Sequence, residues 1–171
     1  MVKLLHTQGV SAELRDLIDS SQEFLILVSP YLRIPQIMRD RIKSRDSRGI
    51  KTILVYRKDT DPSPEELGFL KELQNVSVEA CEHLHAKCYM NERSAIITSM
   101  NLTEYSQMKN WEIGIKIEKD KEPALYTDTF NEINKIIEAC VKKIGKDFEL
   151  QEGTIRETAH PSQDNGYCIR C

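Results

Sequence analysis

A histidine and a lysine two residues apart are the side chains of this sequence best suited to chemistry. In the segment Leu84–Met90, alternation predicts a strand with His85, Lys87 and Tyr89 on one face. Attack on a phosphodiester without a metal requires a nucleophile that is neutral near pH 7, and imidazole qualifies because its ordinary pKa is about 6.5. A lone pair of this kind is usually just the polar face of a strand, so the chemical interpretation depends on the polar residues that accompany it.

Three further polar residues stand at the ends of neighbouring predicted strands. Ser99 and Asn101 follow a strand that ends near Thr98, and Glu112 begins a strand of alternating isoleucines. Polar side chains that leave a sheet together at strand ends form the sites of many α/β folds. If these strands are neighbours, the three side chains converge with His85 and Lys87.

The series His85-x-Lys87, Ser99-x-Asn101 and Glu112 resembles the phospholipase D superfamily, the HKD phosphodiesterases. The resemblance extends over about residues 5–144. The sequence contains one such motif, which is similar to the small bacterial endonucleases and metal-independent restriction enzymes of the superfamily. Lipid-cleaving members usually carry two motifs in a longer chain.

The resemblance implies a role for each residue. His85 would be the nucleophile and would form a phosphohistidine, and Glu112 would accept a hydrogen bond from its other ring nitrogen. Lys87 and Asn101 would hold the non-bridging oxygens, with Ser99 as a further donor. No cofactor is expected for this catalysis. The general acid would be His85 of a second copy, so a homodimer with a shared site is expected.

Two positions depart from the family pattern. The family aspartate should follow the lysine by five residues, where Glu92 stands, and Asn91 fits better if one residue is deleted. The glycine that usually precedes the serine is Thr98. Since the family aspartate looks structural rather than reactive, its loss bears on activity without removing the nucleophile.

Helical and strand patterns alternate along the chain. Helices are predicted over 11–22, 35–48, 64–74 and 123–144, and strands over 24–28, 50–56, 76–80, 84–90, 94–98 and 112–117. Interleaved strands and helices indicate an α/β fold. The expectation is a phospholipase D-like α/β sandwich with a mixed central sheet flanked by helices.

The C-terminal part of the sequence differs in character. We expect a phosphodiesterase domain over 1–145 and a flexible tail over 146–171, where helical periodicity disappears. Cys168 and Cys171 have the spacing of one half of a zinc ribbon, so a longer form could bind zinc there. The alternative is a disordered end with two adventitious thiols.

Composition gives weaker indications about partners and location. The 171 residues carry a net charge of −3, yet nine Lys or Arg lie between Arg33 and Lys58, either as a nucleic-acid footprint or as a solvated helix face. An odd number of cysteines and the lack of an export signal predict reduced thiols and a cytoplasmic location. The absence of a long apolar stretch predicts no stable membrane association.

Two local alternatives remain open. Cys81, His83 and His85 share a predicted strand face, so a zinc site is conceivable. Trp111 and Tyr89 could stack on a base, although packing is the commoner role of such aromatic residues.

The leading hypothesis is a metal-independent phosphodiester hydrolase, and specifically a nuclease that acts as a homodimer. The main alternative is a catalytically silent, dimeric nucleic-acid-binding module of the same fold. A phosphatidyl hydrolase is disfavoured by the single motif.

Overall fold

The computed structural model describes residues 2–60 and 62–141. Its centre is a seven-stranded mixed sheet, and a parallel pair of short strands lies apart from it. In spatial order the sheet strands are β1 (Lys3–His6), β9 (Ile113–Glu118), β7 (Ser94–Thr98), β6 (Cys88–Asn91), β2 (Phe24–Val28), β4 (Lys51–Arg57) and β5 (Val76–Cys81). The short pair is β3 (Leu32–Arg33) with β8 (Leu102–Thr103), and the helices are α1 (Thr7–Ser20), α2 (Gln36–Asp46), α3 (Pro64–Lys71), α4 (Glu104–Met108) and α5 (Pro123–Val141).

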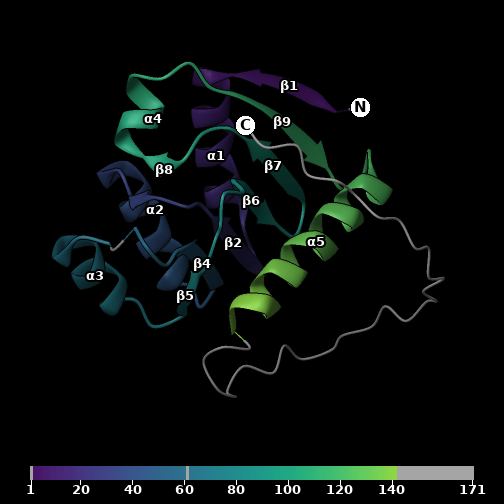
Figure 1. Ribbon diagram of the computed structural model, residues 1–171. Helices are drawn as coiled ribbons and strands as arrows, with labels where there is room; N and C mark the ends of the chain where they lie inside the picture. Colours follow the sequence, from purple (N-terminus) through teal and green to yellow (C-terminus); the bar gives the residue numbers. More distant parts are fainter. Residues whose placement is uncertain (1, 61, 142–171) are drawn as a thin grey trace.

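Helices cover the two faces of the sheet unequally (Figure 1). One apolar cluster joins the sheet to α1, α2 and α3 through residues such as Leu14, Met38 and Leu70. A second cluster joins the other face to α5 alone, through Ile133 and Ile137. Because a single helix covers the second face, part of that face stays accessible.

Strand directions bring several strand ends to one edge of the sheet. β4 is parallel to β2 and β5, whereas β6 is antiparallel to both β2 and β7, and β7 is antiparallel to β9. The carboxyl ends of β2, β4, β5 and β7 therefore meet the amino ends of β6 and β9. All candidate site residues lie at or just beyond this edge, which we call the site edge.

The mixed α/β sandwich predicted from the sequence is confirmed. Gly49 ends the second predicted helix as expected, with a left-handed φ of 75° that favours glycine. The strand predicted over 84–90 begins only at Cys88, and the preceding residues 84–87 have no regular secondary structure. The elements β1, β3, β8 and α4 were not predicted, because runs of two to five residues carry too little periodicity.

The prediction of reduced thiols is wrong for two of the cysteines. Cys81, at the end of β5, forms a disulfide with Cys140 of α5, and the bond spans 59 residues. Cys88 is a buried free thiol, and burial raises its pKa to about 12. The disulfide fixes α5 to the segment that leads from β5 to His85. In the described part of the chain, no helix is long and apolar enough to cross a membrane.

This disulfide makes stability depend on redox conditions. A bond that closes a loop of this length restricts the unfolded chain, so a dithiol reductant should lower the free energy of unfolding by about 2–4 kcal/mol. Urea unfolding with and without reductant measures the change. The double variant Cys81→Ala/Cys140→Ala is the control and should be insensitive to reductant. A wild-type curve that reductant leaves in place would contradict the expectation.

Candidate active site

The antiparallel ladder β6, β7 and β9 brings the predicted site residues to one place. Thr98 N–H donates to the carbonyl of Lys87 at 3.2 Å, and Ser99 N–H donates to the carbonyl of Ile113 at 3.0 Å. The residue before β6, the residue after β7 and the first residue of β9 are thus direct neighbours. The structure brings together the segments that carry His85, Lys87, Ser99 and Glu112.

The side chains of His85 and Lys87 lie side by side, as the spacing predicts. The Lys87 ammonium donates to the His85 carbonyl at 2.9 Å, and its Nζ lies 3.4 Å from Nε2 of the His85 ring. His85 is exposed and Lys87 is half-buried. Partial burial lowers the pKa of Lys87, while Glu112 opposes this shift and Arg57 adds to it. An anion bound here would offset the unfavourable environment of the ammonium.

The carboxylate of Glu112 is held by polar neighbours on two sides. One oxygen accepts a short hydrogen bond from the Ser99 hydroxyl, and the other accepts from the Asn110 amide at 3.1 Å. Thr7, the first residue of α1, accepts a hydrogen bond from the Glu112 N–H at 2.8 Å. The predicted contact of Glu112 with the His85 ring is not among the hydrogen bonds of the described residues and stays a prediction.

Asn101 differs from the other site residues in lacking a partner for its amide oxygen. Its Oδ1 is buried and makes no hydrogen bond within the described residues. The same side chain lines a cavity of about 800 Å³ together with Tyr31, Arg57 and Asn110. A second cavity, of about 610 Å³, is lined by His85, Lys87 and Ser99 and reaches α5. The site residues therefore lie between two cavities.

Two buried residues position the turn that carries Ser99 and Asn101. The Ser29 hydroxyl accepts a hydrogen bond from the Leu102 N–H at 2.9 Å and donates to the carbonyl of Tyr31 at 2.8 Å. The Tyr89 hydroxyl donates to the carbonyl of Met100 at 2.8 Å, and its ring is fully buried. Tyr89 thus has a packing role, whereas Trp111, at 99% exposure, packs against little of its own chain.

Thr98, which replaces the usual glycine, is matched by a glycine on the neighbouring strand. Thr98 pairs with Gly114 of β9, and a Cβ added to Gly114 would meet the Thr98 Cβ at 2.9 Å. The Thr98 hydroxyl donates to the carbonyl of Ile113 at 2.7 Å and accepts from the Met100 N–H at 3.1 Å. Gly114 therefore makes room for a side chain that stabilises the turn.

The family aspartate is expected at the carboxyl end of β6, which is the end away from the site edge. Glu92 follows the last residue of β6, and its carboxylate accepts hydrogen bonds from the backbone N–H groups of Gln22 and Glu23 at 3.2–3.3 Å. The neighbouring Asn91 is fully buried, donates to the Leu17 carbonyl at 2.8 Å and accepts from the Ser94 N–H at 2.9 Å. Both residues fix the link between α1 and the sheet.

The nine cationic residues of segment 33–58 do not form a single surface patch. Arg45 is buried and donates to the carbonyl of Asp19 at 2.7 Å, so it supports the packing of α1. Arg48 precedes β4 and lies away from the site edge. Arg33 and Arg57, by contrast, line the 800 Å³ cavity. Only part of the segment can therefore contribute charge to the site.

The alternative zinc site over Cys81, His83 and His85 is not supported. Cys81 is in the disulfide, and the described residues contain no group of three or more potential ligands. Cys168 and Cys171 lie outside the described residues. Sequence reasoning missed Asn110 and Thr7, and only Asn110, two positions before Glu112, has a sequence signal. Arg57 belongs to the cationic segment that the sequence indicates.

The fold is the phosphodiesterase fold of the phospholipase D superfamily. The family model "Cardiolipin synthase, PLD-like domain" matches residues 14–134. The chain belongs to the phospholipase D superfamily. Among proteins with curated descriptions, no sequence matches this chain.

Solved structures with the same fold include proteins of several kinds. Nuc from Salmonella typhimurium, a phospholipase D family member, has a TM-score of 0.68 at 14% identity and covers 81% of this chain and 95% of its own. NucT from Helicobacter pylori has a TM-score of 0.66 at 21% identity, over 82% and 98%. TrmBL2, an archaeal chromatin protein described with a novel mode of DNA binding, has a TM-score of 0.56 at 17% identity, over 78% and 52%. At these identities the likeness shows the fold.

The fit of Thr98 against Gly114 can be tested by substitution. Gly114→Ala should destabilise the protein by about 1–3 kcal/mol, because the new methyl group overlaps Thr98 and the carbonyl of Ile97. Urea unfolding measures the loss. The double variant Thr98→Gly/Gly114→Ala should recover part of it, since one of the two contacts is removed. Equal losses in the single and double variants would show that Thr98 is not the obstacle.

Proposed function

We propose that this protein is a metal-independent phosphodiester hydrolase, and that its substrate is nucleic acid. The observation that carries the proposal is the cluster of His85, Lys87, Ser99 and Glu112 at the site edge, with Asn101 on the adjoining cavity. An exposed imidazole beside a half-buried ammonium combines a nucleophile with a binding group for phosphate oxygens. These residues occur in a chain that belongs to the phospholipase D superfamily.

In the first step, a ring nitrogen of His85 attacks phosphorus. A phosphorus–nitrogen bond forms as the ester phosphorus–oxygen bond breaks, and the leaving oxygen takes a proton from His85 of a second copy. Lys87 and the Asn101 amide hold the non-bridging oxygens, where negative charge accumulates. Glu112 stabilises the positive charge that develops on the imidazole.

In the second step, water cleaves the phosphohistidine. The second copy's imidazole, now neutral, accepts a proton from the water, and the phosphorus–nitrogen bond breaks to restore His85. The products are an alcohol and a phosphate monoester. Because the nucleophile is imidazole, the scheme assigns no step to a metal ion.

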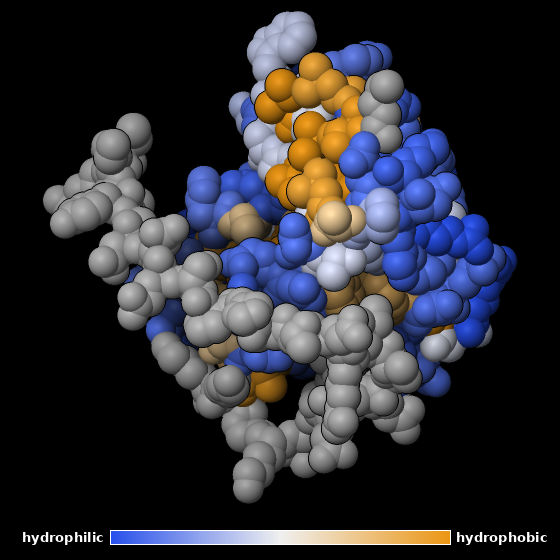
Figure 2. All heavy atoms as spheres, turned by 90° about the vertical axis from the view of Figure 1, so that its right-hand side faces the viewer, coloured by the Kyte–Doolittle hydropathy of each residue, from blue (hydrophilic) through white to orange (hydrophobic). Residues whose placement is uncertain are grey.

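An exposed apolar surface beside the site supports the homodimer. Leu4, Ile97 and Ile113 are 70%, 40% and 59% exposed. Leu4 and Ile97 both pair with Ile115, so these residues form one continuous surface on the α5 face of the sheet. Figure 2 shows apolar atoms gathered at the end of the molecule that carries β1 and β9.

This apolar surface adjoins the cavity that His85 lines, because Ile97 belongs to both. A second copy that covers it about a two-fold axis would border the site and could place its own His85 opposite the first. Apolar patches of this kind commonly mark interaction surfaces. The arrangement supplies the acid that a single motif lacks.

Nuclease activity is tested by digestion of plasmid DNA and of RNA. Wild-type protein should cleave at least one of them, and a chelator should leave the rate unchanged, since imidazole rather than a metal-activated water attacks. His85→Ala should lower the rate by a factor of about a thousand or more, because the covalent route is lost.

His83→Ala is the matched control, since His83 is exposed and lies two residues before His85. It should leave the rate near that of wild type. Loss of activity on chelation, or cleavage by His85→Ala at the wild-type rate, would contradict the mechanism.

The shared site is tested by mixing subunits. When wild-type chains are refolded with an excess of His85→Ala chains, activity should fall more than dilution explains, because mixed dimers lack one of the two imidazoles. Activity against mixing ratio, with the mass in solution from light scattering, is the measurement. A linear fall, or an active monomer, would rule out the shared site.

The alternative functions differ in measurable ways. A catalytically silent nucleic-acid-binding module would bind oligonucleotides without cleaving them, and a phosphatidyl hydrolase would act on lipid vesicles instead. Cytoplasmic location is still a prediction, and the Cys81–Cys140 disulfide bears against it because such bonds are rare in reducing compartments.

A further inference from the structure

We propose that unpaired nucleotides bind in the cavity between β3, α4 and the end of β4, so that the nuclease acts on single strands. We call this cavity the aromatic groove and define it by Tyr31, Arg33, Arg57, Asn101, Tyr105 and Asn110. The inference rests on the proposed function and adds its substrate class.

The aromatic groove opens directly from the catalytic cluster. Asn101 is one of its walls and is also the proposed ligand of a phosphate oxygen. Asn110 is another wall and holds the Glu112 carboxylate. Arg57 is close enough to Lys87 to lower the pKa of that lysine. A strand with its scissile phosphate at Lys87 would therefore place a flanking nucleotide in the groove.

Two tyrosine rings in this groove are accessible from outside. Tyr105 is 68% exposed and Tyr31 is 42% exposed. The Arg57 guanidinium lies 5.0 Å from the centre of the Tyr31 ring and donates to the Tyr31 hydroxyl at 3.0 Å. The ring of Tyr31 is thus oriented by its neighbour, and both rings offer flat surfaces on which a base can stack.

The groove also carries positive charge for the backbone of a strand. Arg33 makes no ion pair or hydrogen bond through its side chain within residues 2–60 and 62–141. Arg57 is paired with Asp59, which is 74% exposed and also lines the groove. Because the Asp59 end of this pair is open to solvent, the pair is weak and can rearrange around a phosphate.

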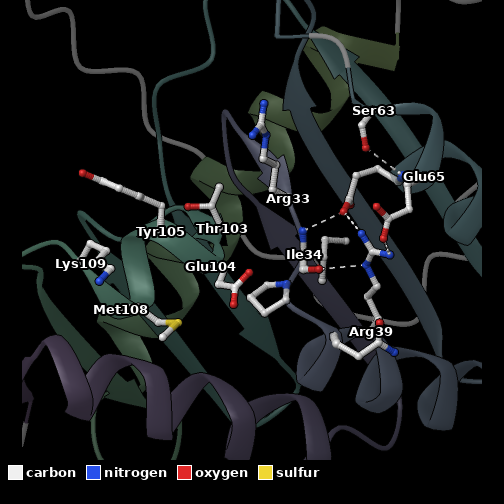
Figure 3. Close-up of a pocket in the computed structure, with 13 residues that line it drawn as sticks. Arg33, Ile34, Arg39, Ser63, Glu65, Thr103, Glu104, Tyr105, Met108 and Lys109 are labelled. Carbon is white, nitrogen blue, oxygen red and sulfur yellow. Dashed lines mark hydrogen bonds and ion pairs between the residues drawn. The ribbon is translucent and has the colours of Figure 1, made fainter.

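A third cavity, of about 840 Å³, adjoins the groove and shares Arg33, Ser63, Thr103 and Tyr105 with it. Figure 3 shows Arg33 and Tyr105 at this cavity, with Arg39 directed toward Glu65. The Arg39 guanidinium forms ion pairs with Glu65 and Glu66, and the Glu104 carboxylate also lines this cavity. The charges that line this cavity balance, with three cationic side chains against three carboxylates, whereas the aromatic groove has Arg33 and Arg57 against Asp59 alone. The bound strand should therefore follow the aromatic groove rather than extend past α4.

The accessible rings distinguish a single strand from a duplex. In a duplex the faces of the bases are covered by their neighbours in the stack, and a protein meets base edges and phosphates. Unpaired bases expose their faces and can stack on aromatic side chains, at a gain of about 1–3 kcal/mol for each base. Tyr31 and Tyr105 therefore favour unpaired nucleotides over a duplex.

The test uses the His85→Ala protein, which separates binding from cleavage. Fluorescence anisotropy with short labelled oligonucleotides should show single-stranded DNA or RNA bound at least about tenfold more tightly than a duplex of the same sequence. Replacing bases with abasic sites keeps the phosphates and should weaken single-strand binding by about tenfold. Comparing the affinities for DNA and RNA oligonucleotides shows whether deoxyribose or ribose is preferred.

Substitutions then assign the effect to the groove. Tyr105→Leu should weaken single-strand binding by about tenfold and leave duplex binding unchanged, whereas Tyr105→Phe should change it less than about twofold. Arg57→Gln should reduce the slope of log affinity against log salt by about one, while Lys135→Gln on α5, a control lysine 73% exposed, should not.

The outcomes separate this inference from the proposed function. If wild type cleaves single strands and duplexes equally and Tyr105→Leu changes neither rate, unpaired nucleotides do not bind in the aromatic groove, and the proposed nuclease activity is retained. If His85→Ala binds single strands through Tyr105 but wild type cleaves no nucleic acid, the aromatic groove binds unpaired nucleotides as proposed, and the proposed hydrolysis is wrong. If no nucleic acid is bound or cleaved, both are overturned.

Discussion

The antiparallel pairing of β6, β7 and β9 is the constraint on which the site depends. This register makes Lys87, Thr98 and Gly114 close neighbours, and it places the start of two strands beside the end of the third. A slip of one residue in either pairing would turn every side chain to the other face. The close approach of Thr98 to Gly114 opposes such a slip, because few other positions could accept the threonine side chain.

Unequal covering of the sheet gives the site two different flanks. On one face α1, α2 and α3 build a thick core, and α4 with β3 forms the polar and aromatic wall beside Asn101. On the other face α5 leaves apolar residues uncovered next to His85. In the function proposed above, one flank serves the substrate and the other serves a second copy, so the two contacts do not compete for the same surface.

Groups remote from the site maintain its geometry. At the far end of β6, Asn91 and Glu92 form hydrogen bonds with backbone groups in and just after α1, and these bonds anchor the helix. At its other end, α1 places Thr7 beside Glu112. The disulfide connects α5 with the end of β5, just before the segment that carries His85. The departure from the family aspartate therefore falls in the part of the molecule that supports the site, away from the nucleophile.

The sequence by itself indicated the main strands, the longer helices and the candidate site residues, because periodicity is local and His85, Lys87, Ser99 and Glu112 stand at or near strand ends. Only the tertiary structure decided which partners these residues have. The contacts of Glu112 with Thr7 and Asn110, the pairing of Cys81 with Cys140, the burial of Arg45 and the exposure of Trp111 depend on segments far apart in the chain. Residue types and local spacing carry no record of such distances, so they become visible only when the chain is folded.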